Sequence, residues 1–312
     1  MTAKIIQDSI NQQDVRITTF ELEYPRFIHS EFMTHRQLSR NSASSRAIPI
    51  RVNIENILSD TAMPVSWGKN QPGMVADENL NKDAAKRAEK IWIDSSRQAL
   101  SAAVSLNTMG VHKQIANRLI ENFTYQKVVV TATEWDNFFW LRNHKDAQPE
   151  IKDLAEKMLK VYKLSVPTKL NPGEWHVPYV KRAWVSDKLY YMDSNREPIS
   201  LEEALKISAS CCAQVSYRKS DDSVEKANKV FDMLNLYDDS DETRKHASPV
   251  EHQATPITRF EYSMNCSNSS SWQLGVTHMD RAGNLWSGNF KEWVQHRQLI
   301  PNESCKNTPE LK

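Results

Sequence analysis

Three patterns follow one another in residues 15–46, which read VRITTFELEYPRFIHSEFMTHRQLSRNSASSR. The β-branched start, 15–22, predicts a strand that Pro25 stops. Residues 26–38 carry apolar side chains at helical spacing and predict a helix. The last thirteen residues, 34–46, then hold three Arg, one His and four Ser with no acidic residue. Such a density of donors suits phosphate groups, because Arg offers a planar fork and Ser a short hydroxyl. A solvated polar face and a nucleic-acid contact are the alternatives.

Helical periodicity dominates the rest of the chain. It predicts helices over 77–107, 111–122, 135–142, 150–162, 200–215, 224–235 and 289–299. A strand is predicted over 125–132, loops over 41–45 and 238–242, and a proline-rich connector over 164–198. The fold class that follows is α+β, without regular βαβ alternation.

Composition excludes several function classes. The 312 residues include only 7 Gly, and no G-x-G or phosphate-loop motif is present, so a nucleotide must be held mainly by side chains. The net charge of +1 shows no excess of positive charge of the kind that favours binding to nucleic acid or to a membrane surface. The four cysteines form no C-x-x-C, which argues against a zinc site or a disulfide framework. Residues 1–13 are polar and show no secretory signal, so we expect a cytoplasmic protein without a bound metal.

A short sequence repeat occurs near the two ends of the chain. His35-Arg-Gln-Leu38 recurs as His296-Arg-Gln-Leu299, and each His is followed six residues later by Asn, Asn41 and Asn302. Both copies are expected to end an amphipathic segment and run into a polar turn. Coincidence is the alternative reading of so short a repeat.

Two further polar groups stand out. Residues 246–252, HASPVEH, combine His and Glu but lack the second His of a zinc H-E-x-x-H motif. Ser248 and Pro249 also suit the start of a helix, where Ser would cap it. Residues 135–142, WDNFFWLR, place Arg142 at the end of an aromatic helix, either reaching solvent or facing an anion in a cleft.

Together these segments resemble the flavin-dependent thymidylate synthases, which carry an R-H-R-x-x-S-x-N-E-x-S-x-R signature, an upstream H-x-[ST]-x-x-E-H and a downstream F-F-x-L-R…A-Q-x-E-I. The signature is matched by His35, Arg36, Ser39, Asn41, Ser44 and Arg46. The upstream segment is matched by His246, Ser248, Glu251 and His252, and the downstream one by Phe138, Phe139, Leu141, Arg142, Ala147, Gln148, Glu150 and Ile151. Residues 213–217, AQVSY, are similar to an early A-R-V-S-[YF] of the family.

The order of these segments differs from that of the family, since its early segments stand here after residue 200. The chain therefore resembles a circular permutation, with the family's C-terminal half in 1–163, a connector in 164–199, and the N-terminal half plus a repeated signature helix in 200–312. Each copy of the signature is incomplete: Thr34 replaces an Arg in the first, and Cys305 replaces a Ser in the second. We therefore expect each copy to supply only part of the functional residues.

The resemblance implies a twisted antiparallel sheet flanked by helices, assembled as a homo-oligomer, a dimer or tetramer, with active sites at subunit interfaces. It implies FAD, a deoxyuridine monophosphate substrate, and methylenetetrahydrofolate and NADPH as co-substrates. The reaction would methylate dUMP to dTMP without a cysteine nucleophile, in the cytoplasm of a bacterium or of a phage host. The alternatives are a flavin-dependent hydroxymethylase of dUMP or dCMP and a non-catalytic nucleotide-binding relative.

Residue by residue, the resemblance implies that Ser44 and Arg142 serve catalysis. Binding of the nucleotide falls to Ser44, Arg46, Arg118 and Arg142. The flavin site is expected to include His35, Arg36, Asn137, His246, Ser248 and Glu251, with His296, Arg297, Asn302 and Glu303 from the second copy. Thr131 and Thr133 stand where the family often has Arg and Asn, so flavin contacts there are in doubt.

Overall fold

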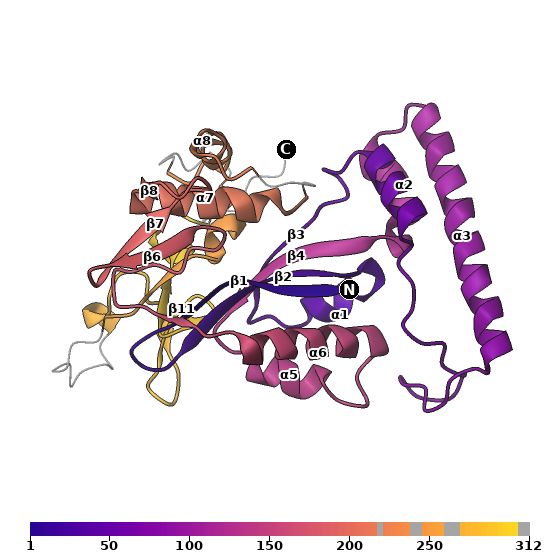
Figure 1. Ribbon diagram of the computed structural model, residues 1–312, viewed down its shortest axis with the longest axis horizontal. Helices are drawn as coiled ribbons and strands as arrows, with labels where there is room; N and C mark the ends of the chain where they lie inside the picture. Colours follow the sequence, from indigo (N-terminus) through magenta and orange to yellow (C-terminus); the bar gives the residue numbers. More distant parts are fainter. Residues whose placement is uncertain (217–220, 238–244, 259–268, 305–312) are drawn as a thin grey trace, which may run out of the picture.

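The computed structural model describes residues 1–216, 221–237, 245–258 and 269–304. Its centre is a five-stranded sheet in the order β3-β4-β2-β1-β5 (Figure 1). The strands are β1 (Thr2–Ile10), β2 (Arg16–Pro25), β3 (Ser39–Ser42), β4 (Tyr125–Ala132) and β5 (Thr168–Lys169). All pairs are antiparallel except β1 with β5. The α+β prediction is confirmed, and β2 and β4 lie where the β-branched runs predict them.

Helices surround this sheet unevenly. They are α1 (His29–Met33), α2 (Ile50–Ser59), α3 (Lys82–Thr108), α4 (Lys113–Ala116), α5 (Asp136–Arg142), α6 (Pro149–Leu164), α7 (Leu201–Ala213) and α8 (Val224–Met233). In Figure 1, α2 and α3 stand at one end of the molecule, away from α7 and α8. Within the described ranges, no helix combines the length and apolar character needed to cross a membrane.

One face of the sheet forms the main core. Because side chains alternate along a strand, Phe20 and Leu22 of β2 and Val130 of β4 all face α5 and α6, and they are fully buried there. Helix α6 begins as its sequence predicts: Pro149 occupies the first turn, and the Gln148 side chain accepts from the backbone N–H of Ile151. Burial of this face fixes the register of β2 and β4.

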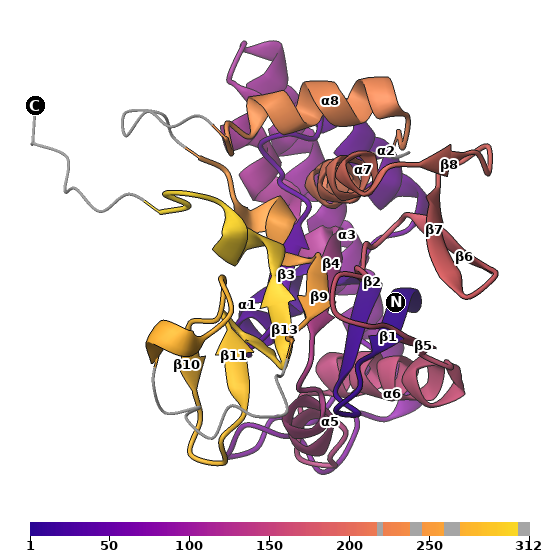
Figure 2. The ribbon, with the colours of Figure 1, turned by 90° about the vertical axis from the view of Figure 1, so that its left-hand side faces the viewer.

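The opposite face of the sheet is covered by the C-terminal half of the chain. Here β9 (Ala254–Pro256) pairs with β13 (Trp293–Gln295), and β10 (His278–Met279), β11 (Leu285–Ser287) and β12 (Phe290–Lys291) form a small sheet beside them (Figure 2). Helix α7, predicted to start at residue 200, begins at a capping box in which Ser200 and Glu203 satisfy each other's backbone N–H groups. Segments far apart in sequence therefore meet at this face.

The expected connector is folded. Within residues 164–199, β6 (Lys181–Val185), β7 (Lys188–Met192) and β8 (Pro198–Ile199) form a three-stranded sheet. Trp175 and Tyr191 pack with it against α7. The predicted acidic loop 238–242, together with Tyr217, Cys266 and Cys305, lies outside the described residues.

Several predicted helices are wrong. Residues 26–38 form a 3-10 turn (Arg26–Ile28), the single helical turn α1, and further turns. The loop predicted over 41–45 is partly β3, which pairs with β4. The helix predicted over 289–299 is β12, β13 and a 3-10 turn, His296–Leu299. Glu292 interrupts any helix there, since its φ of 57° lies in the left-handed region and its buried carboxylate accepts from the Leu285 N–H across 2.8 Å.

Candidate functional site

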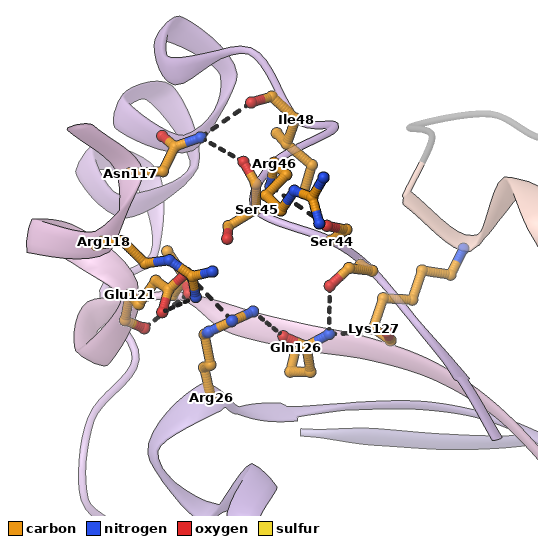
Figure 3. Close-up of polar contacts among 12 residues, drawn as sticks. Arg26, Ser44, Ser45, Arg46, Ile48, Asn117, Arg118, Glu121, Gln126 and Lys127 are labelled. Carbon is orange, nitrogen blue, oxygen red and sulfur yellow. Dashed lines mark hydrogen bonds and ion pairs between the residues drawn. The ribbon is translucent and has the colours of Figure 1, made fainter. Parts of the chain in front are cut away.

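The Ser- and Arg-rich loop, residues 43–48, lies at the edge of the sheet between β3 and α2 (Figure 3). A tight turn shapes it: the backbone N–H groups of Ala47 and Ile48 donate to the Ser44 carbonyl, and that of Arg46 donates to the Ser44 hydroxyl. Asn117 holds the loop from outside, because its amide donates to the carbonyls of Ser45 (2.7 Å) and Ile48 (3.0 Å). The side chains of Ser44 and Arg46 are left exposed.

Arg118, a predicted nucleotide ligand, lies beside this loop (Figure 3). It donates to both carboxylate oxygens of Glu121, across 3.0 and 3.2 Å. Arg26 lies 3.1 Å from Glu121 and also contacts Gln126, whose amide donates to the Ala43 carbonyl. One carboxylate thus faces two guanidinium groups, so this side of the loop stays positive.

A cavity of about 410 Å³ opens next to the loop. Its lining includes Ala43 and Ile48 of the loop, Val52 of α2, and Tyr125 and Lys127 of β4. Binding sites for small molecules commonly have volumes of about 300–1,000 Å³. The cavity therefore has the volume of a small-molecule site. Its lining also includes the carboxylates of Glu21, Glu23 and Asp60, and neither Ser44 nor Arg46 is among the lining residues.

A second group of predicted residues gathers where α5 ends against the turn after α1. The Arg142 Nε–H donates to His35 Nε2 across 2.8 Å, and its Nη2 lies 3.3 Å from the Thr34 hydroxyl. Burial lowers the pKa of His35, the charges of Arg142 and Arg40 act in the same direction, and together they bring it to about 4. A neutral His35 orients Arg142 without neutralising its charge.

Arg40 connects this group with the C-terminal half of the chain. It donates to the His35 carbonyl across 2.7 Å, and its charge acts on both the His35 ring and the Glu251 carboxylate. The sequence prediction does not include Arg40 among the site residues. Its strand position, after Ser39 in β3, becomes visible only once β3 is known to pair with β4.

The two signature copies lie close together, but their side chains differ in burial and in hydrogen-bond partners. Gln295, before the second copy, donates to the Ser39 hydroxyl across 3.1 Å. Arg297 is bound on both sides by carboxylates, Glu251 and Glu303. His296 is buried against Trp175, and its Nδ1 has no hydrogen-bond partner among the described residues. Arg297 is therefore satisfied within the chain, and His296 lies in the core.

The remaining predicted flavin ligands have exposed side chains. Arg36, Asn137, His246 and Asn302 are exposed. Ser248 is also exposed, and its hydroxyl lies 3.5 Å from the Asn41 amide nitrogen. The expected Ser248 helix cap is wrong, because Ser248 lies inside the 3-10 turn Ser248–Glu251 and no side chain caps that turn.

The doubt about Thr131 and Thr133 has a structural basis. The Thr131 hydroxyl is bonded to Thr19 and His252, and the Thr133 hydroxyl accepts from the Lys291 N–H across 3.0 Å. Both are engaged inside the protein. Of the four cysteines, Cys211 and Cys212 are described; both are buried, and burial raises the pKa of the Cys211 thiol to about 12. Such a thiol stays protonated and is a poor nucleophile.

Comparison with known proteins adds a family to this geometry. Residues 15–168 match the family model Thy1, thymidylate synthase complementing protein. The match defines a class of nucleotide-modifying enzymes. Through it the chain belongs to the ThyX family, and the matched residues include Ser44, Arg46, Arg118 and Arg142.

Solved structures similar to this one include two of the UMP/dUMP methylase PolB from Streptomyces cacaoi. The structure with 5-Br UMP shows 17% identity and a TM-score of 0.45, and the alignment covers 52% of this chain and 88% of that one. The structure with 5-Br dUMP shows 20% identity and a TM-score of 0.41, with 48% and 66% covered. No curated protein sequence matches the chain.

Proposed function

We propose that this protein is a flavin-dependent thymidylate synthase that methylates dUMP to dTMP with methylenetetrahydrofolate and NADPH. The observation that carries the proposal is the family match over residues 15–168, which contains both the Ser44–Arg46 loop and Arg142. The side chains of Ser44, Arg46 and Arg142 are at least partly accessible, as groups that meet a substrate must be.

The nucleotide is assigned to the loop and its neighbouring cavity. The monophosphate is placed against Ser44 and Arg46, where a hydroxyl and a guanidinium can donate to its oxygens. Arg118 adds positive charge from the same side, partly offset by Glu121. The hydrogen bonds of Asn117 hold the loop in one conformation, so ligand binding costs little conformational entropy.

FAD fits the first signature copy better than the second. The pyrophosphate of a dinucleotide needs cations that no carboxylate already holds. Among the described residues, Arg36 and Arg142 have no carboxylate at ion-pair distance, and Arg142 is directed by a neutral His35. Arg297 is instead held by Glu251 and Glu303. We therefore assign flavin contacts to Arg36, His35 and Arg142, and a supporting role to Arg297.

When bound, the flavin supplies the hydride that completes methylation. The residues of the chain bind, orient and polarise. Ser44 and Arg46 would hold the nucleotide by its phosphate, and Arg142 would offer a fixed positive charge to the flavin. Neutral His35 keeps the Arg142 guanidinium aimed as long as the imidazole stays unprotonated.

The permuted order and the oligomer belong to the same proposal. The contacts of Arg142 are with Thr34 and His35, and those of the Ser44–Arg46 loop are with Asn117. These two groups are expected to meet across subunits, in a homo-oligomer with shared active sites. The contacts of Asn41 and Ser39 with residues after 240 support a family core in which 200–312 supplies the segments that precede the signature in relatives.

Flavin binding tests this assignment directly. Apoprotein titrated with FAD, followed by quenching of flavin fluorescence, should bind with a stoichiometry of one per chain. Arg36→Ala and Arg142→Ala should each weaken binding about tenfold or more, since a charge-assisted hydrogen bond contributes about 1.5–3 kcal/mol. Arg51→Ala, an exposed residue paired with Glu55, is the control. No binding of FAD to the folded protein would reject the proposal.

A further inference from the structure

A second cavity, of about 830 Å³, lies between the main sheet and the small sheet of β6, β7 and β8 (Figure 2). One side of it is formed by β1, β2 and β4, and the other by residues 179–182 and by Met192 and Arg196. None of the predicted site residues lines this cavity. Glu21 and Lys127 line it and also line the 410 Å³ cavity, so the two cavities are neighbours. We call the larger one the basic cavity.

Positive charge dominates the lining of the basic cavity. Five of its residues are cationic, namely Lys4, Lys127, Lys181, Arg182 and Arg196. Its one carboxylate, that of Glu21, is already engaged, because the Tyr179 hydroxyl donates to Glu21 Oε2 (3.0 Å) and Lys127 Nζ lies 3.1 Å from the same oxygen. Among the described residues, no carboxylate lies at ion-pair distance from the other four cations. These four charges are therefore left without a partner inside the cavity.

Strand geometry explains the sheet side of the basic cavity. Lys4 of β1 lies directly opposite Glu21 of β2 in the antiparallel pair. Because side chains alternate along a strand, both project from the face opposite to the one that carries Phe20 and Leu22. The hydrophobic residues of β2 thus enter the main core, and the charged residues face the cavity.

Two residues on the other side of the cavity take a backbone conformation that is rare for L-amino acids. Tyr179 and Arg196 both have a φ of 70°, in the left-handed region. Such a conformation costs free energy and persists only where the surrounding structure holds it. Asp193, in the turn before Arg196, does not line the cavity, and its carboxylate accepts from the Glu197 N–H across 2.9 Å. The turn thus presents Arg196 to the cavity, while Asp193 is engaged by the backbone.

Arg182 is held at the cavity by neutral groups. Its Nη1 donates to the Ser9 hydroxyl (3.0 Å), and its Nη2 donates to the Asp8 carbonyl (3.2 Å). With its amide oxygen turned toward the guanidinium, Gln7 accepts from Nε (2.6 Å) and Nη2 (3.0 Å). The Asp8 carboxylate is paired with Arg16 instead. Burial lowers the pKa of Arg182 to about 10, so the group stays charged at neutral pH, fixed in orientation and without a carboxylate partner.

A concave surface lined by charges of one sign concentrates counterions. We propose that the basic cavity binds a small, multiply charged anion that carries phosphate or carboxylate groups, with Arg182 as its fixed contact and Lys4, Lys181 and Arg196 around it. A ligand with several anionic groups can reach several of these cations at once and relieves the repulsion between them. The volume of about 830 Å³ lies within the usual range for small-molecule sites, about 300–1,000 Å³. The proposal does not depend on the proposed function.

Isothermal titration of the full protein with tripolyphosphate and, separately, with citrate tests this assignment. At least one of the two should bind, and the tighter one tells whether phosphate or carboxylate groups are preferred. Arg182→Met should weaken that binding about tenfold or more, because a charge-assisted hydrogen bond is lost. Arg46→Met, which removes a cation from the Ser44–Arg46 loop, should leave it unchanged. The proposal is overturned if neither probe binds, or if Arg46→Met weakens binding and folded Arg182→Met does not.

Charge reversal on the hairpin of β6 and β7 is a second test, which leaves the buried Arg182 in place. Lys181 and Lys188 are both exposed, but only Lys181 lines the cavity. Lys188 pairs with Val185, four residues along β6 from Lys181, which is about 13 Å at the rise of a strand. At 0.15 M salt the screening length is about 8 Å. Lys181→Glu should therefore weaken anion binding about tenfold and Lys188→Glu less than about twofold. Equal affinities in these two variants would contradict the proposal even if Arg182→Met failed to fold.

Discussion

The Nε–H of Arg142 donates to Nε2 of His35 across 2.8 Å, which joins the end of α5 to the turn after α1. The acceptor is an uncharged ring, because burial, together with Arg142 and Arg40, lowers the His35 pKa to about 4. A carboxylate in the same place would hold the guanidinium equally well but would cancel its charge. The pairing thus gives a fixed and uncompensated cation, which suits an anionic ligand.

Arg142→Ala should therefore abolish most turnover while leaving the fold intact. The loss of one charge-assisted contact in the transition state corresponds to about 10–100-fold in kcat/KM. Steady-state kinetics with dUMP measure the loss of turnover, and circular dichroism shows whether the fold is intact. His35→Gln should show a smaller loss, because Arg142 keeps its charge but loses its orientation. Unchanged kinetics in Arg142→Ala would place the site elsewhere.

Arg46→Met should act on nucleotide binding. The side chain is exposed and is assigned to the phosphate, so its removal is expected to raise the KM for dUMP about tenfold or more and to change the affinity for FAD little. Isothermal titration with dUMP and with FAD separates the two ligands. An equal loss for both, or a loss only for FAD, would contradict the division between the loop and the His35–Arg142 group.

Asn117→Ala tests whether the loop is preorganised. The buried amide donates to the Ser45 and Ile48 carbonyls, so its removal frees the loop without touching Ser44 or Arg46. We expect the free energy of unfolding to fall by about 1–2 kcal/mol and dUMP to bind more weakly. Urea unfolding measures the change in stability, and the KM for dUMP measures the change in binding. A stability loss without any change in dUMP affinity would show that the loop does not bind the nucleotide.

The sequence predicts the parts of this molecule whose physics is local. The β-branched runs of β2 and β4 act within a few residues, and both strands are found as predicted. The helices predicted over 150–162 and 200–215 are also found, and local signals start them: Pro149 in α6 and the Ser200 capping box in α7. The helix expected over 289–299 fails because Glu292 takes a left-handed backbone and bonds a strand residue seven positions earlier. Pairing with β9 then overrides the helical pattern of apolar residues.

The candidate site follows the same division. Motif positions predict Ser44, Arg46 and Arg142 as site residues, and Arg118, predicted with them, lies beside the loop in Figure 3. The sequence could not show that Arg297 is held by Glu251 and Glu303, or that His296 packs against Trp175, since these contacts join residues from separate segments. It could not show the role of Arg40 for the same reason.

Arg297→Met tests the view that the second signature copy is structural. Glu251 is largely buried, and without Arg297 it loses an ion-pair partner, so the free energy of unfolding should fall by about 2 kcal/mol. Affinity for dUMP should stay near the wild-type value. Arg51→Ala, which breaks an exposed pair, should cost less than about 0.5 kcal/mol. A stable Arg297→Met protein that fails to bind FAD would instead make Arg297 a ligand.

Stability should fall as the pH drops below about 6.5. Burial lowers the pKa of His252 to about 3 and that of His296 to about 4, so between 6.5 and 4 the unfolded chain binds protons that the native chain does not. The native state therefore loses free energy relative to the unfolded state as acid is added. His252→Gln should narrow its stability gap to the wild type between pH 7 and pH 4, as measured by urea unfolding. A gap that stays constant would show that His252 is protonated in the folded protein.

The most direct test of the proposed reaction is the product itself. The purified protein with FAD is incubated with dUMP, methylenetetrahydrofolate and NADPH, and the nucleotide is analysed by mass spectrometry. We predict dTMP, formed only when all four components are present. A 5-hydroxymethyl product would identify the hydroxymethylase, and unchanged dUMP in the presence of bound flavin would contradict the synthase account.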